Sequence, residues 1–413
     1  MPAKTYLVGG AVRDELLGLK AMENDWVVVG STPDEMLAEG FKQVGASFPV
    51  FLHPKSGEEY ALARTEKKQG HGYHGFSVDF HPGVTLEEDL QRRDLTINAI
   101  AQDRDGKLID PFGGQEDLQK RVLRHVSDAF IEDPLRVLRV ARFAARFAPL
   151  GFMVHESTMA LMQEITRSGE LQHLAPERVW KEIERAMMMA SPSEFVVVLR
   201  KCGALEALLP EVNALFGVPQ PEKYHPEIDT GVHLLMALDQ AAALSDGAAN
   251  VVFAILLHDL GKGITPEQKL PSHIGHEAAG IPLVDAVCQR FRVPGAIHDL
   301  ARKVCATHLD CHRVLQARPV TVMRLLEKLD VFRQVDLLPD YIIACEADYR
   351  GRKGLEDRPY PQGEYLQRAY GVAAGILARD LELKGISGPQ VGEHLRMARI
   401  QAISTVSRSR LEH

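Results

Sequence analysis

The sequence predicts an α+β protein in which a small α/β head is followed by α-helical domains. Two observations lead to this fold class. Over residues 5–30, short apolar runs alternate with a glycine turn and a helical stretch, which predicts the order strand, turn, helix, strand. From about Leu118 onward the hydrophobic pattern is almost wholly helical. The length of 413 residues corresponds to about three domains of ordinary size.

The strands of the head are expected in the following order. Residues 6–8 form an apolar run that stops at two glycines, and residues 26–29 are rich in β-branched valine. Further strands are expected at residues 60–63 and 108–109. Between them, residues 67–76 have the glycine density of a loop.

The helical part of the chain is interrupted at residues 216–231. Three prolines fall within eight residues there, which marks a linker or a domain boundary. Helical patterns resume after it and continue through the C-terminal part of the sequence.

Composition and charge restrict the class of protein. The formal net charge is −8, with 48 Lys and Arg against 56 Asp and Glu, so a nucleic-acid partner would have to meet a local basic patch. The five cysteines form no CxxC pair, which indicates reduced thiols in a cytoplasmic enzyme. No apolar stretch approaches the roughly 20 residues that span a bilayer, so we expect no membrane partner.

The first candidate site lies at the start of the head. Two glycines, Gly9 and Gly10, would let backbone N–H groups approach a polyphosphate, and Arg13 follows on the predicted helix. Glu23 and Asp25 are two residues apart at the start of a strand, which places both carboxylates on one face. Such a pair binds hard cations such as Mg²⁺. The alternative is a tight turn beside a solvated acidic loop.

A second candidate site combines two arginine-rich segments. Residues 92–98 (RRDLTIN) also fit a charged helix start, with Thr85 and Glu88 upstream forming a capping box. On the later segment, residues 132–146, arginines spaced 3, 3 and 4 apart share one helix face: Arg136, Arg139, Arg142 and Arg146. A solvated basic face would explain this stripe, and so would a triphosphate or nucleic-acid partner.

A third candidate site follows the proline-rich segment. His258 and Asp259 are adjacent, and His233 lies on a preceding helix. Imidazole and carboxylate groups in this combination can hold a divalent metal that activates water. Taken alone, a His-Asp pair at a helix end is more often a cap.

Together, the motifs GGAVRD, the paired acids, RRDLTINA and EDPLRVLR resemble the bacterial-type (class II) CCA-adding enzymes of the polymerase-beta-like nucleotidyltransferase superfamily. The resemblance implies addition and repair of the 3′-terminal CCA of tRNA from CTP and ATP, with Mg²⁺ held by Glu23 and Asp25. In this family the first acid is usually Asp, so Glu23 is a departure. The resemblance further implies nucleotide contacts from Gly10, Arg13, Arg93, Arg139 and Arg142.

The choice of base is assigned by the same resemblance to Asp133 and Arg136. Cytosine and adenine both present an amino group on the Watson–Crick edge. A carboxylate can accept a hydrogen bond from this amino group, and a guanidinium can donate one to the neighbouring ring nitrogen. Asp133 could also cap the helix ahead of Pro134, and the two roles are compatible.

The third site resembles that of HD-domain phosphohydrolases, matched at His233, His258 and Asp259. This implies phosphatase, 2′-nucleotidase and 2′,3′-cyclic phosphodiesterase activity with a divalent transition metal such as Ni²⁺, or with Mg²⁺. The remaining ligand stays open between three residues: His276, His308 and Asp310.

The resemblance divides the chain into four regions. They are a nucleotidyltransferase head with a nucleotide-recognition neck at 1–148, a helical tRNA-binding body at 149–217, an HD domain at 228–330 and a helical tail at 331–413. We expect a monomer or a homodimer. The alternatives are a poly(A) polymerase, which shares the head motifs, and an HD phosphohydrolase whose head only senses nucleotides.

Overall fold

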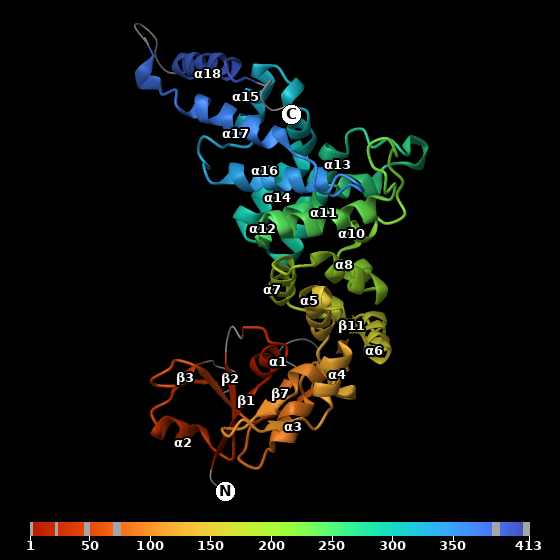
Figure 1. Ribbon diagram of the computed structural model, residues 1–413, viewed down its shortest axis with the longest axis vertical. Coiled ribbons are helices and arrows are strands. Elements are labelled where there is room, and N and C mark those ends of the chain that lie inside the picture. Colours follow the sequence, from red (N-terminus) through yellow and green to blue (C-terminus); the bar gives the residue numbers. More distant parts are fainter. Residues whose placement is uncertain (1–2, 21–23, 45–49, 69–75, 382–388, 408–413) are drawn as a thin grey trace. The chain divides into compact units, whose positions relative to one another are not determined.

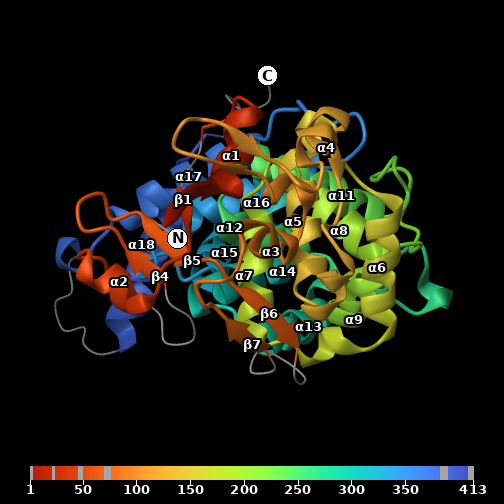
Figure 2. The ribbon, with the colours of Figure 1, turned by 90° about the horizontal axis from the view of Figure 1, so that it is seen from below.

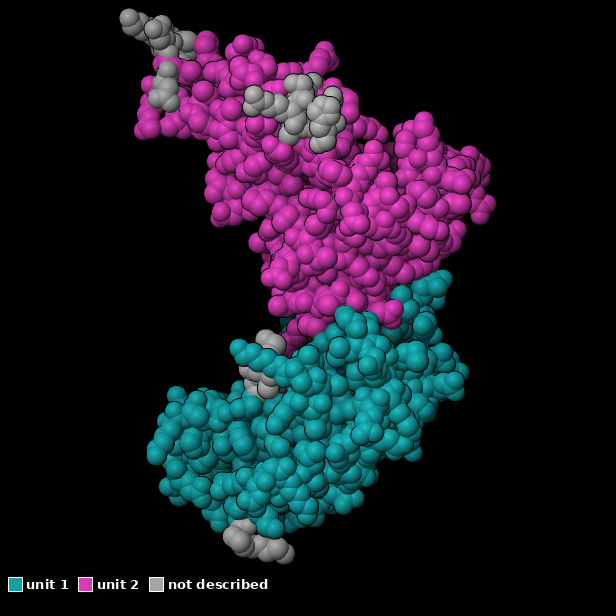
Figure 3. Space-filling view, viewed as in Figure 1, with its two compact units in different colours: residues 1–182, 197–208 teal, residues 183–196, 209–413 magenta. Residues whose placement is uncertain are grey.

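The computed structural model describes residues 3–20, 24–44, 50–68, 76–381 and 389–407 (Figure 1). The chain forms two compact units (Figure 3). Unit 1 contains residues 1–182 and 197–208, and unit 2 contains residues 183–196 and 209–413. Because an α/β head is followed by helices, the predicted fold class is confirmed.

A seven-stranded mixed sheet forms the head in unit 1. Its strand order is β3 (Lys42–Val44), β4 (Val50–Leu52), β5 (Glu59–Leu62), β2 (Asp25–Val29), β1 (Lys4–Val8), β8 (Ala101–Gln102) and β9 (Leu108–Ile109). β2 and β5 run parallel, and the other neighbouring pairs are antiparallel. The four strands expected from the sequence are therefore confirmed.

The valines of β2 explain why the sheet has two covered faces. Val27 packs with Val8 and Leu90 on one side, while Val28 packs on the other side with Met36 and Phe51. Alternate side chains of a strand point to opposite faces, so a run of valines can fill two cores at once.

Two small sheets complete the strands of unit 1. β6 (Thr65–Lys68) and β7 (Phe76–Asp79) pair in antiparallel orientation (Figure 2). β10 (Val122–Leu123) pairs in parallel with β11 (Met153–Val154). The ends of segment 67–76 therefore belong to strands, contrary to the expectation of a loop, and residues 69–75 lie outside the described residues. Two strand residues at the start of the segment and one at its end are too short a pattern to reveal a strand pair.

The helices that begin in unit 1 follow from local signals. Thr85 and Glu88 form the expected capping box at the start of α3. The helices are α1 (Gly10–Leu16), α2 (Pro33–Ala38), α3 (Leu86–Gln91), α4 (Gly114–Lys120), α5 (Arg136–Phe147), α6 (Glu156–Arg167), α7 (Pro176–Met187) and α9 (Ala204–Leu208), with short 3₁₀ turns at η2 (Thr96–Asn98) and η3 (Asp128–Glu132).

Unit 2 is a helical domain built around α12 (Ala249–Leu257). This helix is apolar on all sides, and residues 251–257 are buried, which is typical of the central helix of a core. It packs against α11 (Thr230–Leu244), α14 (Gly295–His312) and α16 (Leu337–Arg350). The other helices that lie wholly or partly in unit 2 are α8 (Pro192–Lys201), α10 (Pro210–Asn213), α13 (His276–Phe291), α15 (Pro319–Lys328), α17 (Pro361–Ala374) and α18 (Pro389–Ser404).

The proline-rich segment at 216–231 is ordered and belongs to unit 2. Pro219 bridges to Asp229, the N–H of Gln220 donates to the carbonyl of Ile228, and the side chain of Gln220 is buried. The prolines thus shape a turn that packs onto the domain, which differs from a free linker. Across the described residues, none of the helices combines the length and the apolar character that crossing a membrane requires.

Gly261 fixes the packing at the end of α12. It lies in the 3₁₀ turn η6 (Leu260–Ile264), and a Cβ added there would overlap the carbonyl oxygen of His276 at the start of α13. The bare glycine therefore lets the loop after His258 and Asp259 lie directly against the helix that carries His276.

Candidate functional site

Asp25 lies at the end of β2 that adjoins the glycine turn. In the register of the sheet it pairs with Val8 of β1 and with Glu59 of β5. Trp26 and Tyr60 stack on each other with ring centroids 5.6 Å apart, so their neighbours Asp25 and Glu59 face the opposite side of the sheet. The register therefore brings a second carboxylate, Glu59, beside Asp25, which the sequence analysis missed. Glu23 lies outside the described residues.

The glycine turn accommodates an arginine from another element. Gly9 has a φ of +68°, and a Cβ there would lie 2.7 Å from Nη1 of Arg93. The same guanidinium donates to the carbonyl of Asn98 and pairs with Asp89. Gly10, the first residue of α1, follows directly. The backbone of the glycine turn and the guanidinium of Arg93 therefore lie together beside Asp25.

Asn98 links the first helix to the RRDLTIN segment. Its amide oxygen accepts from Arg13, and its amide nitrogen donates to Asp94 at 2.9 Å. Arg13 is buried and also pairs with Asp14 at 2.8 Å. Its guanidinium is thus shared between a carboxylate and an amide inside the head.

Asp94 is the buried carboxylate that anchors α5. Arg139 approaches it at 2.7 Å, and the backbone N–H of Leu95 donates to it at 2.8 Å. Burial on its own raises the pKa of the Asp94 carboxyl, but Arg139 and Asn98 outweigh burial and hold the pKa well below its usual range.

The arginine stripe of α5 meets acids from three other parts of unit 1. Arg146 pairs with Asp14 at 2.8 Å, and Arg142 pairs with Glu182 at 2.6 Å. Both acids are buried, and Arg142 is buried with its partner. The stripe is therefore not a solvated basic face, because its charges are matched within the fold. The spacing of the arginines in the sequence predicted that they share one helix face, but it could not reveal the acidic residues that lie opposite that face.

Asp133 and Arg136 lie at the entrance to α5. Asp133 accepts from the N–H of Leu135 at 3.1 Å and pairs with Arg178 at 3.2 Å. The Arg136 guanidinium is buried and donates to the carbonyls of Ala129 and Arg92. Asp133 thus makes the local backbone contact expected of a residue before a helix, and its partner cation is Arg178.

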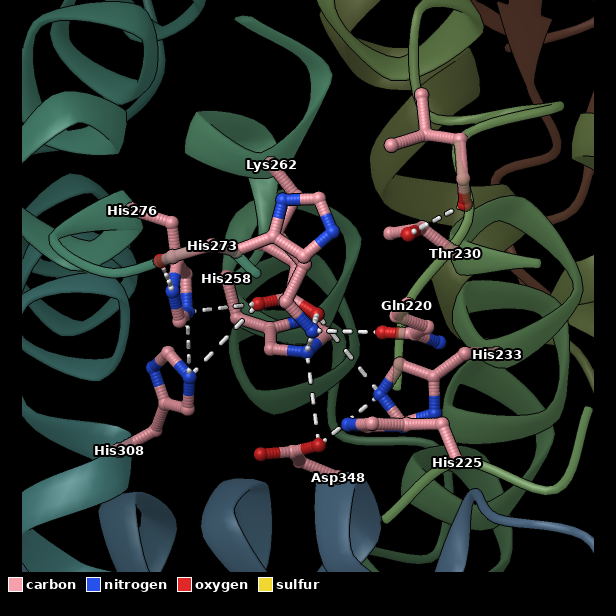
Figure 4. Close-up of polar contacts among 12 residues, drawn as sticks. Gln220, His225, Thr230, His233, His258, Lys262, His273, His276, His308 and Asp348 are labelled. Carbon is pink, nitrogen blue, oxygen red and sulfur yellow. Dashed lines mark hydrogen bonds and ion pairs between the residues drawn. The ribbon is translucent and has the colours of Figure 1, made fainter. Parts of the chain in front are cut away.

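The HD motif lies at the centre of a buried histidine and aspartate cluster in unit 2 (Figure 4). Nε2 of His258 lies 3.2 Å from Oδ2 of Asp259 and 3.7 Å from Oδ1 of Asp348. Nε2 of His233 lies 3.0 Å from the same oxygen of Asp348. His233 from α11, the HD pair after α12 and Asp348 from α16 therefore converge.

Asp348 is a further candidate for the remaining ligand, which the sequence analysis did not name. The candidates were His276, His308 and Asp310. Asp310 is exposed on α14 and pairs with Lys328, so it is excluded. His276 and His308 do lie at the cluster, but on the other side of His258 from His233. Asp348 escaped detection because no local motif surrounds it.

Hydrogen bonds from neighbouring groups orient these side chains. Nδ1 of His258 lies 2.7 Å from the carbonyl of Ile255, and Nδ1 of His233 lies 3.0 Å from the carbonyl of Gly351. Since a carbonyl only accepts, both Nδ1 atoms carry the proton and both Nε2 atoms face the cluster. Nε2 of His312 holds the other oxygen of Asp348 at 2.7 Å.

The electrostatics of the cluster are those of a cation site. Burial alone raises the pKa of the Asp259 carboxyl, but His258 and Lys262 outweigh burial and hold it far below its usual value. Burial lowers the pKa of His308 to about 3, against the opposing effect of Asp348 and Asp259. Within the described residues, three buried atoms of the HD pair have no hydrogen-bond partner: Nε2 of His258 and both carboxylate oxygens of Asp259. Oδ2 of Asp259 does form an ion pair, because Nζ of Lys262 lies 2.6 Å away. Buried polar atoms left in this state fit a bound metal ion.

A cavity of about 610 Å³ opens onto the cluster. Three cations line it, Lys262, Arg313 and Arg352, together with the exposed ring of Tyr224. Cations beside a buried histidine and aspartate cluster suit an anionic substrate, and an aromatic face suits a base.

Comparison with known proteins matches three segments of the chain. Residues 5–124 match the family described as "Poly A polymerase head domain", residues 151–216 match "Probable RNA and SrmB-binding site of polymerase A", and residues 230–349 match "HD domain". The chain is 60% identical over 400 residues to the "Multifunctional CCA protein" of Thioalkalivibrio sulfidiphilus, covering 97% of this chain and 98% of that one.

Solved structures share the fold. The CCA-adding enzyme of Bacillus stearothermophilus in complex with CTP aligns with a TM-score of 0.64 at 23% identity, covering 99% of this chain and 91% of that one. The CCA-adding enzyme of Thermotoga maritima complexed with tRNA aligns with a TM-score of 0.61 at 20% identity, covering 98% and 88% of the two chains.

The ion pair between Asp94 and Arg139 should make the free energy of unfolding of unit 1 depend on pH in the acid range. We expect Asp94→Asn to lower the free energy of unfolding at pH 7 by about 1.5–3 kcal/mol, the usual contribution of a hydrogen bond to a charged group. Because the pKa of Asp94 is lower in the folded state, its stabilisation is present above the unfolded pKa of about 3.9 and is lost as pH falls below it. The difference between variant and parent should therefore shrink toward pH 3.

Urea unfolding followed by tryptophan fluorescence measures this, because both tryptophans, Trp26 and Trp180, lie in unit 1. Asp105→Asn, on an exposed loop, is the matched control. A difference that stays constant from pH 7 to pH 3 would contradict the assigned role of Asp94.

Proposed function

Because the chain belongs to the family of multifunctional CCA proteins, we propose that it adds and repairs the 3′-terminal CCA of tRNA from CTP and ATP, with release of pyrophosphate. The observation that carries this proposal is the 60% identity over nearly the whole of both chains. Chemically, the 3′-hydroxyl of the RNA attacks the α-phosphate of the nucleotide, and pyrophosphate leaves. The enzyme acts chiefly by positioning and by stabilising charge.

The acidic end of β2 is the proposed Mg²⁺ site. Asp25 and Glu23 would hold the ion, and Glu59 lies in register beside Asp25. Carboxylate oxygens are the ligands that Mg²⁺ prefers, so the donor set fits the ion. When bound, Mg²⁺ supplies Lewis-acid activation of the hydroxyl and the α-phosphate.

The nucleotide is proposed to contact Gly10, Arg13, Arg93, Arg139 and Arg142. Arg93 and the half-buried Arg139 are the most accessible of the arginines, with about a fifth and a third of their side chains exposed. We assign the direct phosphate contacts to these two. Arg13 and Arg142 are buried in ion pairs, so they act by holding Asn98 and Glu182 in place.

Asp25→Ala should abolish nucleotide addition, because removal of this carboxylate leaves the metal without a principal ligand. Addition is measured by incorporation of labelled CTP, ATP, UTP and GTP into tRNA that lacks its 3′ CCA, in the presence of Mg²⁺. The parent should add two C and one A and then stop. A long A-tail would instead identify a poly(A) polymerase, and a parental rate in Asp25→Ala would refute the assigned metal site.

Base choice is proposed for Asp133 with Arg136. Asp133 keeps about a fifth of its side chain exposed beside Arg178, so its carboxylate can accept from the amino group of cytosine or adenine. Arg136 is buried and holds the backbone on both sides of this site, at Ala129 and at Arg92. Its role in the proposal is therefore to fix where Asp133 presents its carboxylate.

Asp133→Ala should lose the preference for CTP and ATP over UTP and GTP by about 5- to 150-fold, which corresponds to the roughly 1–3 kcal/mol of one bidentate base contact. Relative kcat/KM values for the four nucleotides measure this. Asp128→Ala removes an exposed carboxylate from the preceding turn and should leave selectivity unchanged. Equal selectivity in both variants would exclude Asp133 as the reader.

The cluster in unit 2 is proposed to hydrolyse phosphate esters as a phosphatase, 2′-nucleotidase and 2′,3′-cyclic phosphodiesterase. His233, His258, Asp259 and Asp348 would hold a divalent ion. Mixed imidazole and carboxylate ligands favour a transition ion such as Ni²⁺ over Mg²⁺. When bound, the ion supplies activation of water and polarisation of the phosphate. Lys262 and Arg352, which line the cavity, would bind the remaining phosphate oxygens.

His258→Ala should lose hydrolysis of 2′,3′-cyclic AMP by at least 100-fold, since an imidazole ligand is removed, while CCA addition stays at the parental rate. Both reactions are measured on the same preparation with added Ni²⁺. His298→Ala, which removes a part-exposed histidine paired with Asp285 elsewhere in unit 2, is the control. Loss of both activities in His258→Ala would contradict two separate sites.

A further inference from the structure

The cavity that opens onto the HD pair has room for more than a phosphate group. Its volume of about 610 Å³ falls within the range of about 300–1,000 Å³ that is usual for sites of small organic ligands. Two histidines of the cluster, His276 and His312, line it. Apolar side chains line it as well: Pro221, Tyr224, Ile274 and Leu309. A phosphate ion has no apolar surface, so this lining suits a ligand that also has an apolar part.

Tyr224 presents an aromatic ring at this cavity. The residue is 58% exposed, and it lies on the proline-rich segment that packs onto unit 2. Nζ of Lys223 lies over one face of the ring, 5.4 Å from its centroid. Ile274, which is 94% exposed, adds an apolar side chain from the turn before α13. A nucleobase can stack on an exposed ring of this kind, because each base has a π-face.

The charges that line the cavity favour an anion. Among the described residues of its lining, three are Lys or Arg cations, Lys262, Arg313 and Arg352, and one is an acid, Glu277. Oε2 of Glu277 lies 3.5 Å from Nδ1 of His276. Nε of Arg352 is buried and has no hydrogen-bond partner within the described part of the chain. A guanidinium in this state is suited to donate to an anionic ligand.

The three cations lie in different surroundings. Nζ of Lys262 is 2.6 Å from Oδ2 of Asp259, and Nη2 of Arg352 is 3.8 Å from Oδ1 of Asp348, so both adjoin the cluster. Arg313 directly follows α14, is exposed, and forms no ion pair with an acid that the structure describes. The reacting phosphate therefore has two cations beside the cluster, and Arg313 is available for a second phosphate.

We propose that this cavity binds the terminal nucleotide of an RNA chain, with its base stacked on Tyr224 and the preceding phosphodiester bound by Arg313. The inference rests on the proposed phosphohydrolase function, in which Lys262 and Arg352 bind the reacting phosphate. A free nucleotide with a 2′- or 2′,3′-phosphate fills the base and phosphate positions alone. The end of a chain also brings the second phosphate, so it should bind more tightly than the free nucleotide.

The stacking contact is tested with the full chain and added Ni²⁺. Tyr224→Ala should raise the KM for 2′,3′-cyclic AMP by about 5- to 150-fold, the usual effect of removing one stacked base. Tyr224→Phe keeps the ring and should keep the parental KM. The comparison substrate is 1-deoxyribose 2,3-cyclic phosphate, which has no base, so its KM should not distinguish the two variants. Far-UV circular dichroism checks that each variant is folded.

The second phosphate is tested with the dinucleotide ApA that ends in a 2′,3′-cyclic phosphate. The parent should hydrolyse it with a lower KM than 2′,3′-cyclic AMP. Arg313→Ala should remove this difference, so that the two substrates have similar KM values. Arg318→Ala, which removes an exposed arginine at the start of α15, is the matched control and should retain the difference.

Equal KM values for the two substrates in the parent would overturn the role of Arg313 and identify a site for free nucleotides. A KM that rises as much for the base-free phosphate in Tyr224→Ala would overturn the stacking contact. If the parent hydrolyses none of these substrates, the proposed function fails, and equilibrium dialysis with labelled 2′-AMP tests the subsite without catalysis. Weaker binding by Tyr224→Ala than by Tyr224→Phe would then support the subsite, and equal binding would overturn it.

Discussion

The structure depends at two places on a carboxylate that is buried and must be matched by positive charge. In unit 1, Asp94 is matched by the protein itself, through Arg139 and the amide of Asn98. In unit 2, Asp259 lies beside the ammonium group of Lys262 and is otherwise surrounded by imidazoles, those of His258, His276 and His308. Because an unmatched buried charge costs several kcal/mol, the first arrangement is complete within the head, while the second is suited to an added cation.

The surroundings of Asp259 depend on a glycine, Gly261, which has no side chain. Gly261 allows the loop after Asp259 to lie against the carbonyl of His276, which brings α13 close enough for its first residue to face the carboxylate. The apolar helix α12 holds His258 and Asp259 from the other side, since it is buried among α11, α14 and α16. The side chains of the cluster therefore come from several helices whose mutual positions are fixed by one core.

Much of this could be predicted from the sequence where the signal is local. The β-branched run of β2, the capping box of α3 and the adjacent His258 and Asp259 each lie within a few residues. Asp348 could not be found in this way, because it lies 115 residues after His233 and only tertiary packing joins them. The meaning of the arginine stripe also depended on distant residues, since Arg146 meets Asp14 across 132 positions and Arg139 meets Asp94 across 45.

These distant acids change how the head can recognise a nucleotide. In a chain with a net charge of −8, an uncompensated row of arginines would bind any polyanion, and its affinity would be set mainly by salt. Ion pairs with Asp14, Asp94 and Glu182 instead fix the orientation of three of these four guanidinium groups before a nucleotide arrives. The donors that remain are few and preorganised, so they favour one placement of a triphosphate rather than anions in general. Selectivity in the head therefore follows from the same charge matching that stabilises it.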